Sequence, residues 1–388
     1  MSSYDVAVVG LGTMGSYTCC ELARRGLTVV GLDRFSPPHN RGSHSGATRV
    51  FRIAYAEHPS YVPLAQRAGV LWDRYAEEAG VPLLHRCGML SIGSPDSALI
   101  QGVEKSSALY GIAATKHTSE EVRRMFPVIE PSRDHVGLFE PSAGWIDVQA
   151  AIETAQRFSQ QAGATLLTDS PVLNVVSRAN HFTLTVSDDE IMAQKVVVTA
   201  GPWSGQLLSQ LGLPLHVERR VVVWVNPLIA DRFTPDVLPI FAFAERFFYG
   251  FPSIGGQGVK MATHWERGHA VDDPTSLLAD ATFEEAEPVL EMASRFLPSL
   301  AGPLPGALDR VAALKTCLYT MSPDEHFIID RHPQWENLVF ATGFSGHGFK
   351  FAPVIGEALA DLAMFGTSPL PVDFLRVGSR FADRAPLA

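Results

Sequence analysis

The sequence predicts an α/β protein in which a parallel sheet is combined with a second, mixed α+β domain built on an antiparallel sheet. Three observations lead to this expectation. An apolar strand at residues 6–9 runs into a glycine turn and a helix, and the same order recurs at residues 338–365. Residues 219–226 form a β-branched strand suited to a different sheet. The two chain ends are therefore expected to build one Rossmann-like domain, with the middle of the chain inserted as the second.

The first glycine turn has the spacing of a dinucleotide-binding fingerprint. Gly10 permits the tight turn, Gly12 lets the backbone approach a pyrophosphate, and Gly15 lets the helix pack on the strand. The helix N-terminus offers free N–H groups and the positive end of its dipole to the anion. Asp33 ends the second strand, 23 residues after Gly10, and its carboxylate can accept hydrogen bonds from a ribose diol. The same carboxylate would repel a 2′-phosphate, so NADP is disfavoured.

The second glycine loop, residues 343–350, leads into a helix expected at residues 351–365. Two such loops, more than three hundred residues apart, are not the plan of a simple NAD dehydrogenase. A cofactor that extends beyond the first loop, and whose redox ring lies at a second helix N-terminus, would need both glycine loops. FAD fits this requirement, because the positive end of the helix after Gly348 can stabilise the anionic N1–C2=O group of reduced flavin.

The order of segments predicts how the two domains share the chain. Residues 35–46 form a loop rich in Pro, Gly and Ser, of a length that is usually functional. A helix is expected at residues 61–80, with strands at 89–93, 166–176, 182–186 and 195–199. The cofactor domain is expected to comprise residues 1–81, 148–214 and 314–388, and the substrate domain residues 82–147 and 215–313.

Composition favours a small-molecule enzyme. The chain has 388 residues, 46% of them hydrophobic, and a net charge of −10, which argues against a nucleic-acid surface. The apolar runs are shorter than a membrane span, and the first strand begins without a cleavable signal, so a soluble, cytoplasmic protein is expected. The four cysteines lack metal-type spacing, so neither a metal site nor a disulfide framework is predicted.

Several motifs occur together along the chain. Besides the first glycine turn they lie at residues 42–52, 249–252, 260–264, 316–319, 323–330 and 343–350. Over essentially its whole length the chain resembles the monomeric sarcosine oxidase and N-methyltryptophan oxidase group, within the D-amino-acid-oxidase-like flavoproteins. Where that group often reads Gly-Ser-His-His-Gly-Asp-Thr-Arg, this chain has Ser45 and Ala47 in place of the second histidine and the aspartate.

The resemblance implies that Cys317 carries FAD through a thioether to the flavin 8α-methyl carbon. This chemistry needs a thiolate beside an electron-poor methyl group, and strand alternation places Lys315, Cys317 and Tyr319 on one face. Spacing alone favours a buried structural cysteine at Cys317, and the resemblance reverses this preference.

The resemblance also implies roles for four charged or ionisable side chains. Lys260 corresponds to a lysine over the flavin that promotes its reaction with oxygen, since a fixed cation stabilises developing superoxide. On a strand, His264 faces the same side as Lys260. Arg52 and Lys350 correspond to the pair that holds the substrate carboxylate. The sequence alone leaves a solvated lysine and a surface ion pair as alternatives.

Arg49 corresponds to a residue near the flavin ring, and Tyr249 and His347 to residues of the substrate pocket. His264, His347 and Tyr249 are candidates for hydrogen bonding or proton handling, and no residue must act as a strong base. The full set of expected cofactor-binding residues is Gly10, Gly12, Thr13, Met14, Gly15, Asp33, Arg34, Ser43, His44, Thr48, Arg49, Val172, Ala200, Gly201, Trp203, Cys317, Gly343, Phe344, Gly346, His347, Gly348 and Lys350.

The resemblance thus implies a monomeric FAD-dependent oxidase of secondary amino acids, N-methyl amino acids first, that produces hydrogen peroxide. Formaldehyde follows when the N-methyl carbon is oxidised. Oxidation of cyclic imino acids such as pipecolate or proline, a flavin dehydrogenase with an electron carrier, and a non-catalytic nucleotide-binding module remain as alternatives. The aromatic run Phe241, Phe243, Phe247, Phe248 and Tyr249 is expected in the core.

Overall fold

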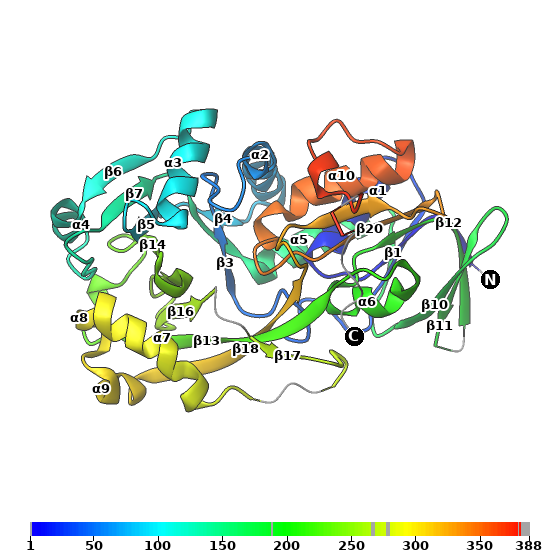
Figure 1. Ribbon diagram of the computed structural model, residues 1–388. Coiled ribbons are helices and arrows are strands. Elements are labelled where there is room, and N and C mark those ends of the chain that lie inside the picture. Colours follow the sequence, from blue (N-terminus) through cyan, green and yellow to red (C-terminus); the bar gives the residue numbers. More distant parts are fainter. Residues whose placement is uncertain (1, 188, 265–267, 277–279, 379, 382–388) are drawn as a thin grey trace.

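The computed structural model describes residues 2–187, 189–264, 268–276, 280–378 and 380–381. Two large sheets form the centres of two lobes, and both chain ends lie in the same lobe (Figure 1). Helices cover the outer face of each lobe, and long strands run between the two.

The first lobe is built on an eight-stranded sheet whose central strands are parallel, in the order β20-β12-β1-β2-β9. The β10–β11–β12 meander and the β19–β20 pair add antiparallel strands to it. The strands are β1 (Ser2–Val9), β2 (Val29–Leu32), β9 (Thr165–Leu167), β10 (Val172–Ser177), β11 (Phe182–Val186), β12 (Asp189–Val198), β19 (Ile328–Arg331) and β20 (Leu338–Thr342). The sheet combines segments from the start, middle and end of the chain, because buried apolar runs such as those of β1 and β20 pair best where both faces are covered.

The second lobe holds a nine-stranded sheet that is antiparallel except at the β5–β14 pair. Its strands are β5 (Met89–Gly93), β6 (Thr115–Thr118), β7 (Val136–Glu140), β13 (His216–Val225), β14 (Ile240–Phe243), β15 (Phe248–Phe251), β16 (Val259–Thr263), β17 (His269–Ala270) and β18 (Val311–Met321). A small sheet of β3 (Thr48–Phe51), β4 (Leu84–His85) and β8 (Gly144–Asp147) lies between the lobes.

The helices bury apolar faces against these sheets. Side chains of α1, α2, α5 and α10 share one core with the parallel strands, while α7 packs on the second sheet. The helices are α1 (Thr13–Arg24), α2 (Tyr61–Ala79), α3 (Ala98–Tyr110), α4 (Ser119–Met125), α5 (Val148–Gln161), α6 (Ser204–Leu207), α7 (Phe283–Phe296), α8 (Pro298–Ala301), α9 (Leu304–Leu308) and α10 (Ala352–Phe365). Short 3₁₀ turns lie at Gly201–Trp203, Ser209–Leu211, Ala230–Arg232, Glu245–Phe247, Phe349–Phe351 and Asp373–Leu375.

The expected elements are present, with two differences. The strand expected at residues 166–176 is interrupted: β9 ends at Leu167 and β10 begins at Val172, with Asp169 in a left-handed turn between them. The expected domain boundary at residues 313 and 314 falls inside β18, which pairs with β13 of the second sheet along its whole length. The domain boundaries themselves stay a prediction. Among the described residues, no helix is long and apolar enough to span a membrane.

Candidate active site

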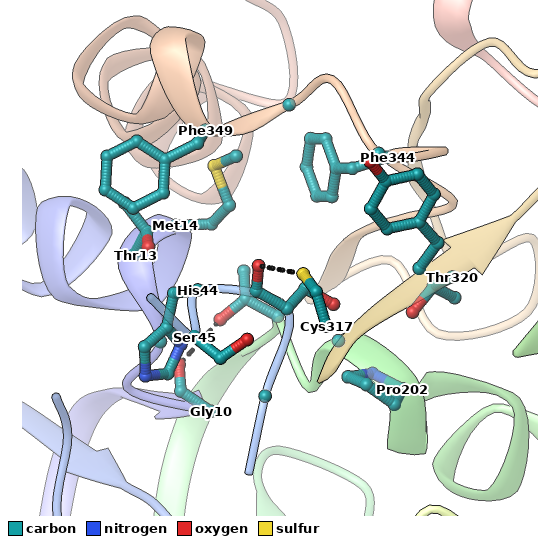
Figure 2. A pocket seen from close by; sticks show the side chains of 18 of the residues that line it. Gly10, Thr13, Met14, His44, Ser45, Pro202, Cys317, Thr320, Phe344 and Phe349 are labelled. Atoms are coloured by element: carbon teal, nitrogen blue, oxygen red, sulfur yellow. Dashed lines mark hydrogen bonds between the residues drawn. The ribbon is translucent and has the colours of Figure 1, made fainter. Parts of the chain in front are cut away.

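One cavity of about 650 Å³ is lined by residues of both large sheets and of the small one. Every site residue expected from the sequence lines it except Gly15. Figure 2 shows Thr13 and Met14 of α1 on one side of this cavity, Cys317 and Thr320 of β18 on another, and Phe344 and Phe349 of the second glycine loop above them. The fold therefore joins the two glycine loops in a single site.

At one end of the cavity, the N-terminus of α1 is open. Gly10 has φ +96°, and a Cβ there would meet the backbone of Thr199 at the end of β12. Gly15 packs against the Gly10 carbonyl, so its place is between helix and strand, as its spacing predicts. No side chain caps this helix, its first turn has no acidic residue, and the Thr13 hydroxyl has no partner among the described residues. These are the properties of an anion-binding helix terminus.

Asp33 directly follows β2 and braces this turn. Its carboxylate accepts the Leu11 N–H at 2.6 Å and the Phe35 N–H at 2.9 Å. Beside it, the Arg34 guanidinium lies 5.8 Å from the centroid of the Trp203 ring. Asp33 is thus held by the backbone at the rim of the cavity, where a hydroxyl-bearing ligand can reach it.

Cys317 lies in β18, almost buried, under the loop that contains Ser43 and His44. Its sulfur is 3.5 Å from Nη2 of Arg49 and 3.7 Å from the Ser43 carbonyl oxygen. The Arg49 guanidinium also donates to the carbonyls of Ser43 and Ser45, so it connects this loop to the cysteine. The sulfur therefore lies beside a positive charge in the lining of the cavity.

Lys260 in β16 is buried, and its ammonium group donates to the Thr48 carbonyl at 2.8 Å and the Thr48 hydroxyl at 3.2 Å. The rings of Phe251 and Trp224 lie 4.6 and 5.5 Å from Nζ. Burial, and then the charge of Arg49, holds the pKa of Lys260 well below its usual value. The solvated-lysine alternative is therefore wrong.

Arg52 is buried, and its Nη2 donates to both carboxylate oxygens of Glu57, at 2.5 and 2.6 Å. Its guanidinium also stacks over Tyr55 at 4.2 Å. Burial opposes ionisation of Glu57, but Arg52, His347 and Lys350 outweigh it and lower the Glu57 pKa. Arg52 thus already holds a carboxylate, through Nη2 alone, and that carboxylate belongs to the protein.

Lys350 and His347 also contact Tyr55. Lys350 donates to the His347 carbonyl at 2.7 Å, and burial, followed by the charge of Arg52, lowers its pKa to about 7. Nε2 of His347 donates to the Glu325 carbonyl at 3.0 Å, so its Nδ1 accepts from the Tyr55 hydroxyl at 2.5 Å. Burial lowers the His347 pKa to about 3, which keeps this ring neutral.

Tyr249, His264 and Tyr319 form the wall opposite this pair. Nδ1 of His264 is 3.4 Å from the Tyr319 hydroxyl. Burial raises the pKa of Tyr249 and lowers that of His264 to about 4. At neutral pH this wall is uncharged and presents only hydrogen-bonding groups.

The aromatic run is divided between core and cavity. Phe241, Phe243 and Phe248 are fully buried in the core beneath α7, as expected. Phe247 and Tyr249 line the cavity together with Phe251, because alternate residues of β15 point to opposite faces of the sheet.

The remaining expected cofactor residues line the cavity between the Gly10 turn and the Arg52–Lys350 region. Burial lowers the pKa of His44 to about 3, and its Nε2 accepts the His39 N–H at 3.2 Å. Val172 begins β10, and the turn after β12 contains Ala200, Gly201 and Trp203. Gly343, Phe344, Gly346 and Gly348 belong to the loop between β20 and α10.

Three residues of the site were not singled out as site residues from the sequence alone. Glu57 and Tyr55 contact Arg52, and Tyr319 contacts His264. Tyr319 was expected only on the face of Cys317. The position of Glu57, five residues after Arg52, was the one available signal, because a buried arginine requires a carboxylate.

Comparison with known proteins identifies the family. The model of the FAD dependent oxidoreductase family matches residues 5–362. The chain belongs to this family. The oxidoreductase is 35% identical over 375 residues to a monomeric sarcosine oxidase of Streptomyces avermitilis, covering 95% of this chain and 96% of the relative. It is 33% identical to the N-methyl-L-tryptophan oxidase of Yersinia pestis, over 95% of this chain and 97% of that protein.

Among solved structures, the oxidoreductase is similar to NikD, an amino acid oxidase essential for nikkomycin biosynthesis. The TM-score is 0.83 at 25% identity, covering 97% of this chain and 98% of NikD. The L-proline dehydrogenase of P. horikoshii shares the fold, with a TM-score of 0.82 at 22% identity, over 97% of each chain.

The site residues of this oxidoreductase fit FAD. The uncapped N-terminus of α1 and the close approach of Gly10 to β12 leave an open cradle for a pyrophosphate. The cavity then extends from Asp33 to Cys317 and on to Lys350, so one continuous space can hold an elongated cofactor. The basic side chains of its lining, Arg49 and Lys260 among them, suit a ring system that becomes negatively charged on reduction.

Proposed function

We propose that this protein is an FAD-dependent oxidase of secondary amino acids, with N-methyl amino acids as the first class of substrate. The observation that carries the proposal is the continuity of the cavity, which connects the nucleotide cradle at Gly10 to the buried cations Arg52 and Lys350. A carboxylate held by these cations would present the neighbouring amine to the cofactor. The relatives named sarcosine oxidase and N-methyl-L-tryptophan oxidase support this substrate class.

Arg52 and Lys350 would bind the substrate carboxylate together. Arg52 can donate to a substrate carboxylate in place of that of Glu57, since both offer the same pair of oxygens. Lys350 adds a second positive charge, which a bound carboxylate stabilises in its protonated form. Release of Glu57 from Arg52 on substrate binding therefore accompanies this proposal.

Once bound, FAD supplies the acceptor for two electrons and a proton from the amine, and oxygen then takes up these electrons to give hydrogen peroxide. Lys260 donates hydrogen bonds from a buried position and can stabilise charge that develops on oxygen. His264, His347 and Tyr249 are neutral hydrogen-bonding groups around the substrate, and Arg49 places its charge beside Cys317. The imine product hydrolyses, releasing formaldehyde when the N-methyl carbon is oxidised.

The substrate class is tested on the purified holoprotein with a peroxide assay across sarcosine, N-methyltryptophan and pipecolate. We expect peroxide with at least one N-methyl amino acid and none with the corresponding N-acetyl compound, which has no basic amine. Pipecolate as the sole substrate would establish the cyclic imino acid alternative. Flavin bleaching under nitrogen without aerobic peroxide would instead identify a dehydrogenase, and no response to any secondary amine would refute the substrate class.

We also propose that Cys317 carries FAD covalently. Its sulfur lies beside Arg49 and faces the cavity, although Ser45 and Ala47 replace two residues common in the resembled group. After acid precipitation the yellow colour should stay with the pellet of the wild-type protein and move to the supernatant for Cys317→Ser. Cys87→Ser, at a half-buried cysteine outside the cavity, is the control. Colour lost from the wild-type pellet would disprove the linkage.

A monomeric state and a cytoplasmic location complete the proposal. Size-exclusion chromatography with light scattering should give the mass of one chain, 42.1 kDa plus cofactor. A mass of two chains or more would contradict the monomer.

A further inference from the structure

A buried ion pair lies in β13 next to the cavity wall, in residues that the proposed function does not use. Glu218 and Arg220 are 8% and 9% exposed, and Nη2 of Arg220 donates to the Glu218 carboxylate at 2.5 Å. In the pairing of β13 with β18, Glu218 is opposite Tyr319 and Arg220 is opposite Cys317. Directly paired residues point to the same face of a sheet, so the ion pair lies beside Cys317 and Tyr319 on the face that these two residues share.

Arg220 contacts the wall through Tyr319. Its guanidinium carbon lies 5.3 Å from the centroid of the Tyr319 ring, in a cation–π contact. On the loop after β20, Gly346 packs so closely on the same ring that a Cβ there would overlap it. Tyr319 is therefore confined between a guanidinium from one lobe and a glycine loop from the other.

The ion pair is anchored on its far side as well. The Glu218 carboxylate accepts the Gly268 N–H at 3.1 Å and lies 3.1 Å from Nε2 of His216. Nε of Arg220 has no hydrogen-bond partner among the described residues, so the contacts with Glu218 and with the Tyr319 ring stabilise its charge. Loss of either contact would leave Arg220 poorly compensated in a buried place.

We propose that Arg220 is a positioning residue of this active site, which fixes the Tyr319 ring and, through the Tyr319 hydroxyl, the place of His264. Only the kinetic consequences of this inference rest on the proposed function. Arg220 does not line the cavity, and it acts on the substrate end through Tyr319.

The charge of Arg220 has a second effect, on His264. Burial is the largest reason that the His264 pKa falls to about 4, and the cations Arg220, Arg52 and Lys350 lower it further, while Glu57 raises it. Tyr319, which hydrogen-bonds to His264, and Phe247, whose ring packs on it, carry no charge at neutral pH. Removal of Arg220 should therefore raise the pH at which His264 becomes protonated.

The test uses the paired variant Glu218→Gln/Arg220→Met, which removes both charges and so leaves no unpaired ion in the core. The holoprotein is labelled with ¹⁵N in its 13 histidines, and the His264 signals are assigned by their loss in His264→Asn. We expect the paired variant to titrate His264 at a higher pH than the wild type. Arg220→Lys, which keeps the charge but not the planar stack, should restore the titration.

A matched control lies on the same strand. Arg219 pairs with Glu285 on the opposite face of β13, so Arg219→Gln/Glu285→Gln removes an equivalent ion pair without contact to Tyr319. This control should leave the His264 titration unchanged. Thermal unfolding of all variants, followed by circular dichroism, confirms that each is folded.

Displacement of the wall formed by Tyr249, His264 and Tyr319 should also change the kinetics. We expect kcat/KM of the paired variant for its best substrate to fall by between roughly 10- and 100-fold, as for other misplaced active-site groups. An unchanged His264 titration, or the same change in the control, would overturn the proposal. If the wild type oxidises no secondary amine, the proposed function fails, whereas the histidine titration still decides the role of Arg220.

Discussion

The two ends of the cavity are built in different ways. At the nucleotide end, backbone groups of the Gly10 turn and the N-terminus of α1 face the cavity, and Asp33 holds that turn through main-chain N–H groups. At the substrate end, buried side chains form the site: Arg52 pairs with Glu57, while Lys260 and Lys350 donate hydrogen bonds to backbone carbonyls. A site made of backbone depends on local sequence, and a site made of side chains depends on which distant segments meet.

This difference predicts that the nucleotide end tolerates the least change. Gly10→Val should abolish cofactor binding, because a side chain at φ +96° is strained and would strike Thr199. We expect the free energy of FAD binding to weaken by at least about 3 kcal/mol, which is a loss of more than roughly 100-fold in affinity. The flavin absorbance per protein, measured in a Cys317→Ser background, reports it. Gly26→Val, also at positive φ but with open space around it, should keep the cofactor.

At the substrate end, Arg52→Met should weaken the proposed carboxylate site without loss of flavin. The cost should be about 3 kcal/mol, or roughly 100-fold in kcat/KM, since a charged partner is removed from a buried ion pair. Steady-state kinetics with the best substrate measures this effect. Arg67→Met is the matched control, because Arg67 also makes a paired contact with a glutamate, Glu357, but outside the cavity. Equal losses in both variants would refute a specific role for Arg52.

Lys350 should make carboxylate binding depend on pH. Its pKa is lowered to about 7 in the free site, so it is protonated below that pH and becomes neutral above it. Affinity for a simple carboxylate such as propionate, followed by the flavin spectrum, should therefore be constant below pH 7 and fall above it, by up to about tenfold per unit. Lys350→Met should remove this dependence. A constant affinity from pH 6 to 9 in the wild type would contradict it.

The smallest effect should come from Asp33→Asn at the nucleotide end. Asparagine keeps one acceptor for the Leu11 or Phe35 N–H but loses the charge that favours a ribose diol. We expect FAD binding to weaken by about 1 kcal/mol, which is a loss of roughly fivefold in affinity. Apoprotein reconstitution in the Cys317→Ser background measures it. A hundredfold loss would mean that Asp33 mainly supports the turn.

The elements that the sequence predicts correctly are those with strong local signals. The strand, turn and helix around Gly10 and the same order before α10 were both expected, because their apolar runs and glycines act within a few residues. The break between β9 and β10 was missed, since a left-handed Asp169 leaves little trace in an apolar pattern. The membership of β18 in the second sheet depends on its pairing with β13, almost a hundred residues earlier.

For the site, the resemblance to a family supplied the residues, and the structure supplied their partners. The sequence alone is compatible with an exposed Lys260, whereas in the structure its side chain is buried and donates to Thr48 of the small sheet. Arg52 was expected to hold a ligand and holds Glu57 instead. Such pairings cannot be predicted from the sequence, because each partner comes from a different element.

The amino-acid sequence alone therefore determines the nucleotide cradle, since backbone conformation at Gly10 and the free N–H groups of α1 follow from local steric and hydrogen-bonding rules. The tertiary structure alone decides the charge state of the substrate end. The pKa values of Lys350, His347 and His264 fall because segments far apart in the chain bury these groups together, and burial is a property of the folded whole.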